Sequence, residues 1–455
     1  MGKSSKTKEE NLGVKVRRSK TKKVEEEKDK IEEHPIAKAV TSFIHGVRDI
    51  EVAALTHIQI AFERRKERFE NLIGIIENEE KKINSNDDKN NVHITSTMNI
   101  MNAVENINRL QNSKVPQVLE LSLFLGLFSI YDNFTGELLT AIYLKKPELF
   151  NRVEHSISLS EILQFNSFEE LKILALQQEI EDFRRKSYVE QFEELERTFQ
   201  IKLKEFPKWG NFVECGQRRN LLTHAGGVVS KQYLKMCERE KVSFPSILKV
   251  GDKLEIGTNY FVESCELLIE VGFKLGQTLW RKVYPEEIEI ADSHLIGTVF
   301  EDCLKMDSWD RGQVFGEFAI NLKKKASDLN HIIFSINYAI SLKFDGKHKE
   351  TKETLSKIDW SALSNEFKLA EAVLSDNYEK ATELMNKIGK TGDYIYEESY
   401  HQFPLFKEFR QTKQFLETYE KIYGQSFANK VQKDADKQTE EVEKQNIEEM
   451  KLKET

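Results

Sequence analysis

One segment of the sequence carries side chains that could act together on a phosphodiester. The stretch ECGQRRNLLTHAGG covers residues 214–227 and ends in a glycine pair, which is a common end for a helix. At about 100° per residue, a helix here places Arg219, Asn220 and His224 on one polar face. The two leucines between them point to the other side, where they can enter a core. Arg218 points with the leucines, so Arg219 is the better candidate for a functional arginine.

These residue types suit phosphodiester chemistry. A guanidinium can hold a phosphate through two hydrogen bonds and stabilise the negative charge that develops on it. An imidazole titrates near neutral pH and can move a proton to or from a 2′-hydroxyl or a leaving oxygen. If the 2′-hydroxyl of RNA is the nucleophile, this reaction needs no metal and no cofactor.

The charge distribution agrees with a local phosphate site. Residues 201–239 carry eight basic and three acidic side chains, whereas the whole chain of 455 residues has a net charge of −8. The acidic balance argues against a protein that coats nucleic acid over its whole surface, but a local basic groove remains possible. We therefore expect RNA as a partner at this segment only.

Other chemistries lack their signatures. The four cysteines, which lie 22, 28 and 38 residues apart, form no CxxC pair, and the histidines show no metal-ligand spacing. No HExxH, GxSxG or GxGxxG motif occurs. Gly389-Lys390-Thr391 resembles the end of a phosphate-binding loop, but Leu384 occupies the position of its first glycine. We expect neither a metal nor a cofactor.

The elements around this segment are predicted to be helical, because the chain has only 7 prolines and 21 glycines. This scarcity argues against a β-sandwich or a β-barrel. The longest charge-free apolar window, Leu121–Tyr131, is shorter than the roughly 20 residues that span a membrane. With no secretory signal at the start, the expectation is a cytoplasmic protein without membrane contact.

A charged tail over residues 1–34 precedes the first predicted helix, which starts at Pro35. In this helix an apolar residue recurs every seven positions, at Leu55, Phe62, Phe69, Ile76 and Ile83. The stripe could be a coiled-coil partner face. The favoured alternative is packing within its own domain, because Arg65 and Glu79 interrupt the second seam.

Three further elements complete the first region. A helix that opens at Pro116 is apolar almost all round, as in the centre of a bundle, and contains Asp132. The alternation in residues 248–257 predicts a small β-hairpin, followed by a helix over 260–283. Residues 35–287 therefore form one predicted helical domain.

The second region, residues 288–425, is also predicted to be helical. Two short stretches 31 residues apart, 339–345 and 370–376, have the rhythm of helical hairpins, and a TPR-like array is one interpretation. Such a region could bind a regulatory protein partner. Residues 426–455 form a predicted polar tail.

Longer strings of sequence resemble a known family. RRNLLTHAGGVVSKQYL, then VGDKLEIGTNYF and LLIEVGFKLGQTLW, together with the upstream FSIYDNF, resemble the RiboL-PSP-type HEPN domain over about residues 95–285. The resemblance implies a helical bundle that forms a homodimer, in which two Arg/His motifs face each other across a cleft. It also implies a metal-independent endoribonuclease, used in antiphage defence or as a toxin.

Carried over to this chain, the resemblance makes Arg219 and His224 the catalytic pair and Asn220 the polar partner of the arginine. Asp132 falls where many such domains place an acidic residue, as a possible accessory group. Two alternatives stay open: a catalytically inactive HEPN domain that binds RNA or protein, and a helical interaction protein whose motif arose by chance. Cleavage of RNA that depends on Arg219 and His224 would distinguish an active endoribonuclease from both alternatives.

Overall fold

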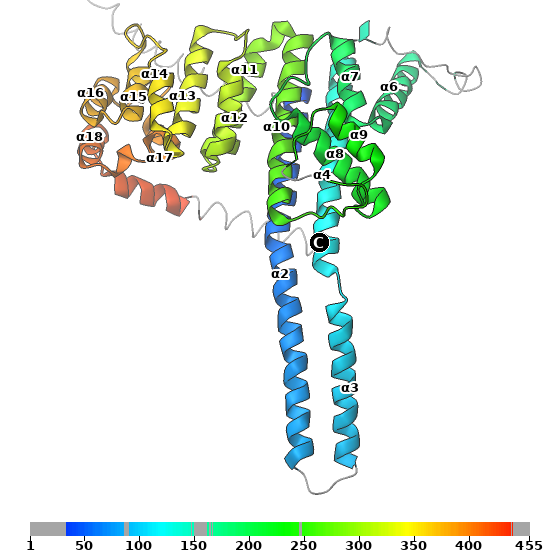
Figure 1. Cartoon of the computed structure of the whole chain (residues 1–455). Helices are drawn as coiled ribbons and strands as arrows, with labels where there is room; N and C mark the ends of the chain where they lie inside the picture. The colour runs from blue at the N-terminus through cyan, green and yellow to red at the C-terminus, as the bar shows by residue number, and fades with distance from the viewer. Residues whose placement is uncertain are drawn as a thin grey trace, which may run out of the picture. The chain divides into compact units, whose positions relative to one another are not determined.

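A computed structural model shows a mainly α-helical protein, with no strand in the part of the chain that it describes (Figure 1). The described residues are 33–85, 91–146, 167–244 and 248–437, with a few isolated positions besides. Nearly all of the predicted tail 1–34 and the end of the predicted tail 426–455 lie outside them. The beginning of the second tail, residues 427–437, is helical.

The chain folds into two compact units. The first contains residues 1–196 and 213–261, and the second contains residues 197–212 and 262–455. Three helices, α7, α8 and α10, continue from one unit into the other. The helices that contribute to the first unit are α2 (Pro35–Ser85), α3 (Asn91–Gln111), α4 (Val115–Lys145), α6 (Phe168–Arg185), α7 (Tyr188–Phe199), α8 (Trp209–Ala225), α9 (Lys231–Arg239) and α10 (Thr258–Val283).

Helix α4 forms the centre of the first unit, as its all-round apolar sequence predicts. A proline in its first turn suits a helix start, because that position needs no backbone donor. Phe124, Phe128 and Tyr131 are fully buried on it. The ring of Phe43 from α2 stacks on Phe134 of α4 with centroids 4.5 Å apart. This aromatic core fixes the two helices to each other.

Helix α2 packs on α4 near its start and on α3 further along (Figure 1). For the apolar stripe of α2, the sequence leaves open a partner face or packing within its own domain. Different parts of the stripe fit each alternative. Phe69 and Ile76 are half-buried within the hairpin of α2 and α3, whereas Leu55 and Phe62 are 50% and 48% exposed. Only part of the stripe therefore packs within its own unit.

The predicted β-hairpin over residues 248–257 is not formed. The segment turns at Val250–Gly251 and pairs with the residues that follow α8, through a single antiparallel bridge between Val228 and Lys253. The Val229 amide donates to the Asp252 carbonyl at 2.8 Å. The alternation correctly indicated extended backbone. However, residues 248–257 form their hydrogen bonds with the residues after α8 and not with each other.

The second unit is built from shorter helices. Helices α13 and α14, and likewise α15 and α16, pack as consecutive pairs joined by three-residue turns. Such pairs are helical hairpins, and their TPR-like character stays a prediction. After α10 the elements are η2 (Pro285–Glu287), α11 (Ile288–Thr298), η3 (Val299–Leu304), α12 (Trp309–Ile320), α13 (Asp328–Phe344), α14 (His348–Leu355), α15 (Asn365–Leu374), α16 (Tyr378–Ile388), α17 (Glu397–Gln402), η4 (Pro404–Phe406), η5 (Phe409–Gln411) and α18 (Lys413–Tyr423).

One described stretch, His93–Lys145, is long and apolar enough to cross a membrane by length and composition alone. This property is weak evidence for a membrane span, because a core helix of a soluble protein satisfies the same criterion.

Candidate active site

Helix α8 positions the three residues that the motif singles out. It ends where the sequence predicts, at Gly226 and Gly227, whose φ angles are +57° and +81°. Gly227 donates its amide to the Leu221 carbonyl at 3.0 Å, which closes the last turn. A Cβ at Gly227 would lie 2.5 Å from the Leu254 carbonyl oxygen, so the pairing with residues 252–254 requires glycine here.

A cavity of about 530 Å³ in the first unit brings all four predicted site residues together. Arg219, Asn220 and His224 line it from α8, and Asp132 lines it from α4. The end of α6, the start of α7, further residues of α8 and the start of α9 supply the rest of the wall. The further lining residues are Arg184, Arg185, Lys186, Ser187, Tyr188, Gln217, Leu221, Ala225, Ser230, Gln232 and Tyr233.

The Arg219 guanidinium is held on several sides but still reaches the cavity. Its Nη1 donates to Asn220 Oδ1 at 3.0 Å, and its Nη2 lies 3.9 Å from Asp132 Oδ2. The guanidinium carbon sits 5.9 Å from the ring centroid of Phe128. With 31% of its side chain exposed, Arg219 is oriented by protein groups and open to a ligand.

Asp132 is fixed by Tyr188. The Tyr188 hydroxyl donates to Asp132 Oδ1 at 3.0 Å. Burial raises the pKa of Asp132, against the opposing effects of the Tyr188 hydrogen bond and the charges of Arg219 and Arg184. Burial and the neighbouring carboxylate also raise the pKa of Tyr188, so its hydroxyl stays protonated and remains a donor.

Two glycines allow the corner between α6 and α7 to approach the site. Arg184 lies across α4, where its Nε donates to the Asp132 carbonyl at 2.8 Å. A Cβ at Gly136 would overlap the Arg184 guanidinium. On the other side, a Cβ at Gly216 of α8 would lie 2.6 Å from Cδ2 of Tyr188. Larger residues at either position would move this wall of the cavity.

His224 lies on the last turn of α8 and is exposed to solvent. In the part of the chain that the structure describes, its imidazole makes no hydrogen bond or ion pair. A ring in this position is accessible to a ligand in the cavity.

The environment of Arg218 differs from that of its neighbour Arg219, because its guanidinium is held within the protein. Its Nε donates to Glu214 Oε1 at 2.7 Å, and its guanidinium stacks on the Tyr260 ring at 3.9 Å. Glu214 also accepts hydrogen bonds from Tyr233 at 2.8 Å and from Tyr260 at 2.6 Å. The Arg218 side chain is 15% exposed and absent from the cavity lining, as its expected direction away from the polar face of α8 implies.

Sequence reasoning missed the part of the site that comes from α6 and α7. Arg184, Lys186 and Tyr188 line the cavity, and none of them belongs to the motif segment. The basic run Arg184-Arg185-Lys186 at the end of a helix was a usable signal. Nothing in the sequence indicated that this run lies against α4 and α8.

Within the described ranges, no group of three or more His, Cys, Asp or Glu side chains is arranged to hold a metal ion.

Comparisons with known proteins add no identification. No protein-family model, no curated protein sequence and no solved structure matches this chain.

Proposed function

We propose that this protein is an endoribonuclease that cleaves RNA at the cavity lined by α4, α6, α7, α8 and the start of α9. The observation that carries the proposal is the convergence of Arg219, Asn220 and His224 with Asp132 and the basic corner at residues 184–186. Arginine and histidine supply the two requirements of the reaction, which are charge stabilisation and proton transfer. HEPN membership, and with it a role in antiphage defence or as a toxin, belongs to the same proposal.

In the proposed reaction the 2′-oxygen forms a bond to phosphorus while the bond from phosphorus to the 5′-oxygen breaks. A proton leaves the 2′-hydroxyl, and a proton is delivered to the departing 5′-oxygen. His224 carries the proton at one of these two oxygens, and Arg219 holds the nonbridging oxygens. Asn220 and Asp132 keep the Arg219 guanidinium oriented, at the distances of 3.0 and 3.9 Å given above. The products are a 2′,3′-cyclic phosphate and a 5′-hydroxyl.

The test uses RNA oligonucleotides with the purified full-length protein. We expect cleavage in the presence of EDTA, with cyclic-phosphate ends, and no cleavage where the sugar 5′ of the scissile phosphate is 2′-deoxy. His224→Ala should lower the rate by roughly two orders of magnitude or more. His348→Ala, which changes another exposed histidine, is the matched control. Cleavage that requires added Mg²⁺, or that is unchanged in His224→Ala, would refute the mechanism.

A second candidate is an RNA-binding module without cleavage. It is favoured by the basic corner, because Arg184, Arg185 and Lys186 all line the cavity that Arg219 lines. Such groups position phosphates but transfer no proton. Salt-dependent binding of RNA with intact substrate after long incubation would support this alternative.

A further inference from the structure

The second unit contains a cavity of about 760 Å³ that the proposed nuclease reaction does not use. Helices α10, α12 and α13 supply most of its lining, and α12 and α13 pack side by side (Figure 1). A Cβ at Gly316 of α12 would lie 2.8 Å from Cδ2 of Tyr338, so only a glycine lets the tyrosine ring lie this close to α12. The ring of Tyr338 is therefore held at the cavity wall.

The lining of this cavity is acidic, with six carboxylates and three basic side chains. Each basic side chain forms an ion pair with an acidic side chain of the same lining. The three pairs are Lys208 with Glu270, Arg311 with Glu266, and Lys347 with Asp345. Three carboxylates, those of Asp307, Asp310 and Glu317, are left without a cation from the lining.

Asp307 shows which kind of group this wall binds. Lys407, which is not part of the lining, donates from its Nζ to both carboxylate oxygens of Asp307 at 2.8 Å. The same Nζ lies 5.3 Å from the ring centroid of Trp309, another lining residue. A carboxylate beside an aromatic ring attracts an ammonium group through both its charge and the ring face. The chain's own lysine thus occupies one such place at the edge of the cavity.

A second carboxylate and ring lie in the cavity without a lysine or arginine. Burial and the nearby charge of Glu317 raise the pKa of Tyr338, so its hydroxyl is protonated at neutral pH. In the described part of the chain, neither the Tyr338 hydroxyl nor the Glu317 carboxylate makes a hydrogen bond, and Glu317 forms no ion pair.

Asp310 extends this acidic surface along α12. It lies seven residues before Glu317, so the two carboxylates are on the same face of the helix and about 10 Å apart along its axis. Val314 lies between them in the cavity lining. Within the described ranges, Asp310 also makes no hydrogen bond or ion pair. The face therefore presents two exposed carboxylates on either side of an apolar contact.

We propose that this cavity binds a basic segment of a partner protein, whose lysine or arginine side chains lie beside Glu317 and Asp310. In an extended segment, side chains on one face recur every 6 to 7 Å or so, and long basic side chains can reach carboxylates about 10 Å apart. A neutral or acidic segment gains no such pairing, so the lining selects its partner by charge. The proposal gives a chemical class to the regulatory partner expected of the second helical region, and it does not depend on the nuclease function.

The experiment measures the binding of fluorescently labelled octalysine to the full-length protein by anisotropy, at about 0.15 M salt to screen weak surface attraction. We expect saturable binding that weakens roughly tenfold or more in Asp310→Asn/Glu317→Gln. Glu379→Gln/Glu383→Gln is the matched control, because it removes the same charge from α16, again with one acid in the first turn, and neither residue lines the cavity. The control should bind octalysine as the wild type does. All four residues are exposed, so helical circular dichroism should not change.

Spermine is the second probe, because it carries positive charge without a polypeptide backbone. It should displace octalysine only at a much higher concentration. The proposal is overturned if octalysine shows no saturable binding to the wild type, or if the two double variants weaken its binding equally. Displacement by spermine at a concentration equal to that of octalysine would assign the cavity to a small polyamine and would also overturn it. RNA cleavage does not enter this measurement, so failure of the nuclease proposal leaves its outcome unchanged.

Discussion

Arg218 and Arg219 are neighbours in the chain, yet their guanidinium groups have different surroundings. Arg219→Ala removes a group that is 31% exposed in the cavity, so cleavage should fall by about two orders of magnitude while the melting temperature changes little. Arg218→Ala leaves Glu214 buried with only two tyrosine donors, which should lower the free energy of unfolding by roughly 3 kcal/mol. Thermal melts and initial cleavage rates of both variants measure this contrast. A reversed pattern would show that the functional arginine is Arg218.

Asp132 gives a prediction about pH. Its pKa is raised by burial above the ordinary value of 3.8, so the folded state binds its proton more tightly than the unfolded state does. Stability is therefore lost as the pH rises from 3.8 through the folded pKa. Asp132→Asn keeps an acceptor for Tyr188 without the buried charge, and should melt at an equal or higher temperature at pH 7. This advantage should vanish near pH 4.

The same substitution should reduce cleavage by about ten- to a hundredfold, because Arg219 loses a group that orients it. Melting temperatures from pH 4 to 8 and cleavage rates at neutral pH test both halves of this prediction. A variant that melts well below the wild type at pH 7 would show that the attraction to Arg219 outweighs the cost of burial.

At the scale of elements, two glycines test how the α6–α7 corner is placed, and Gly74 of α2 is their control. Gly216→Ala forces the buried Tyr188 ring to move, so we expect a loss of about 1–3 kcal/mol and weak cleavage. Gly136→Ala meets only the end of Arg184, which can swing away, so RNA affinity should fall with little change in stability. Gly74→Ala meets nothing within 4 Å and should stabilise α2 by up to about 1 kcal/mol. Equal melting temperatures for the first two variants would contradict this account.

These elements also show what the sequence can predict. Pro116 and the apolar run after it located α4, and the Gly226-Gly227 pair located the end of α8, because these signals are local. Arithmetic of the same local kind separated Arg219 from Arg218. Tyr188 could not be found and the basic run at Arg184 could not be placed at the site, because both reach it through tertiary packing on α4 and α8 that no spacing encodes. The β-hairpin predicted for residues 248–257 was wrong for the same reason, because this segment pairs with the residues that follow α8.

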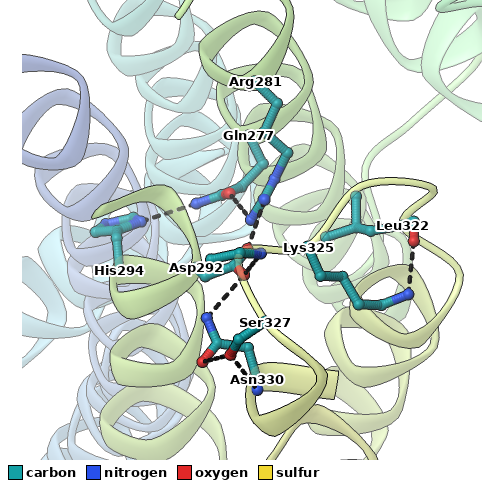
Figure 2. A network of polar contacts seen from close by, with 9 residues as sticks. Gln277, Arg281, Asp292, His294, Leu322, Lys325, Ser327 and Asn330 are labelled. Atoms are coloured by element: carbon teal, nitrogen blue, oxygen red, sulfur yellow. Dashed lines mark hydrogen bonds and ion pairs between the residues drawn. The ribbon is translucent and has the colours of Figure 1, made fainter. Parts of the chain in front are cut away.

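At the scale of the whole molecule, the second unit holds a buried ionic network (Figure 2). Arg281 of α10 donates to Asp292 of α11 at 2.5 Å and to Gln277 at 3.1 Å. The other oxygen of Asp292, which is fully buried, accepts from the Ala326 amide and from Asn330. The network ties the C-terminal part of α10 to the start of the second helical region. We propose that this region binds a regulatory partner, so its attachment to α10 matters for control.

The last prediction concerns a chain cut after Glu287, at the domain boundary that composition suggests. The cut removes Asp292 and His294, so Arg281, Gln277 and the apolar face around Trp280 lose their partners. Leaving one member of a buried ion pair alone costs roughly 3–5 kcal/mol, a large part of the stability of a domain. We expect the fragment 1–287 to aggregate, or to melt at least several degrees below the full-length protein, as judged by circular dichroism and gel filtration. Full-length Arg281→Met/Asp292→Leu is the control, because it removes both charges together and should retain most of its stability. A monodisperse fragment that melts with the full-length protein would place the boundary at residue 287 after all, and would make α10 independent of the network that now surrounds its end.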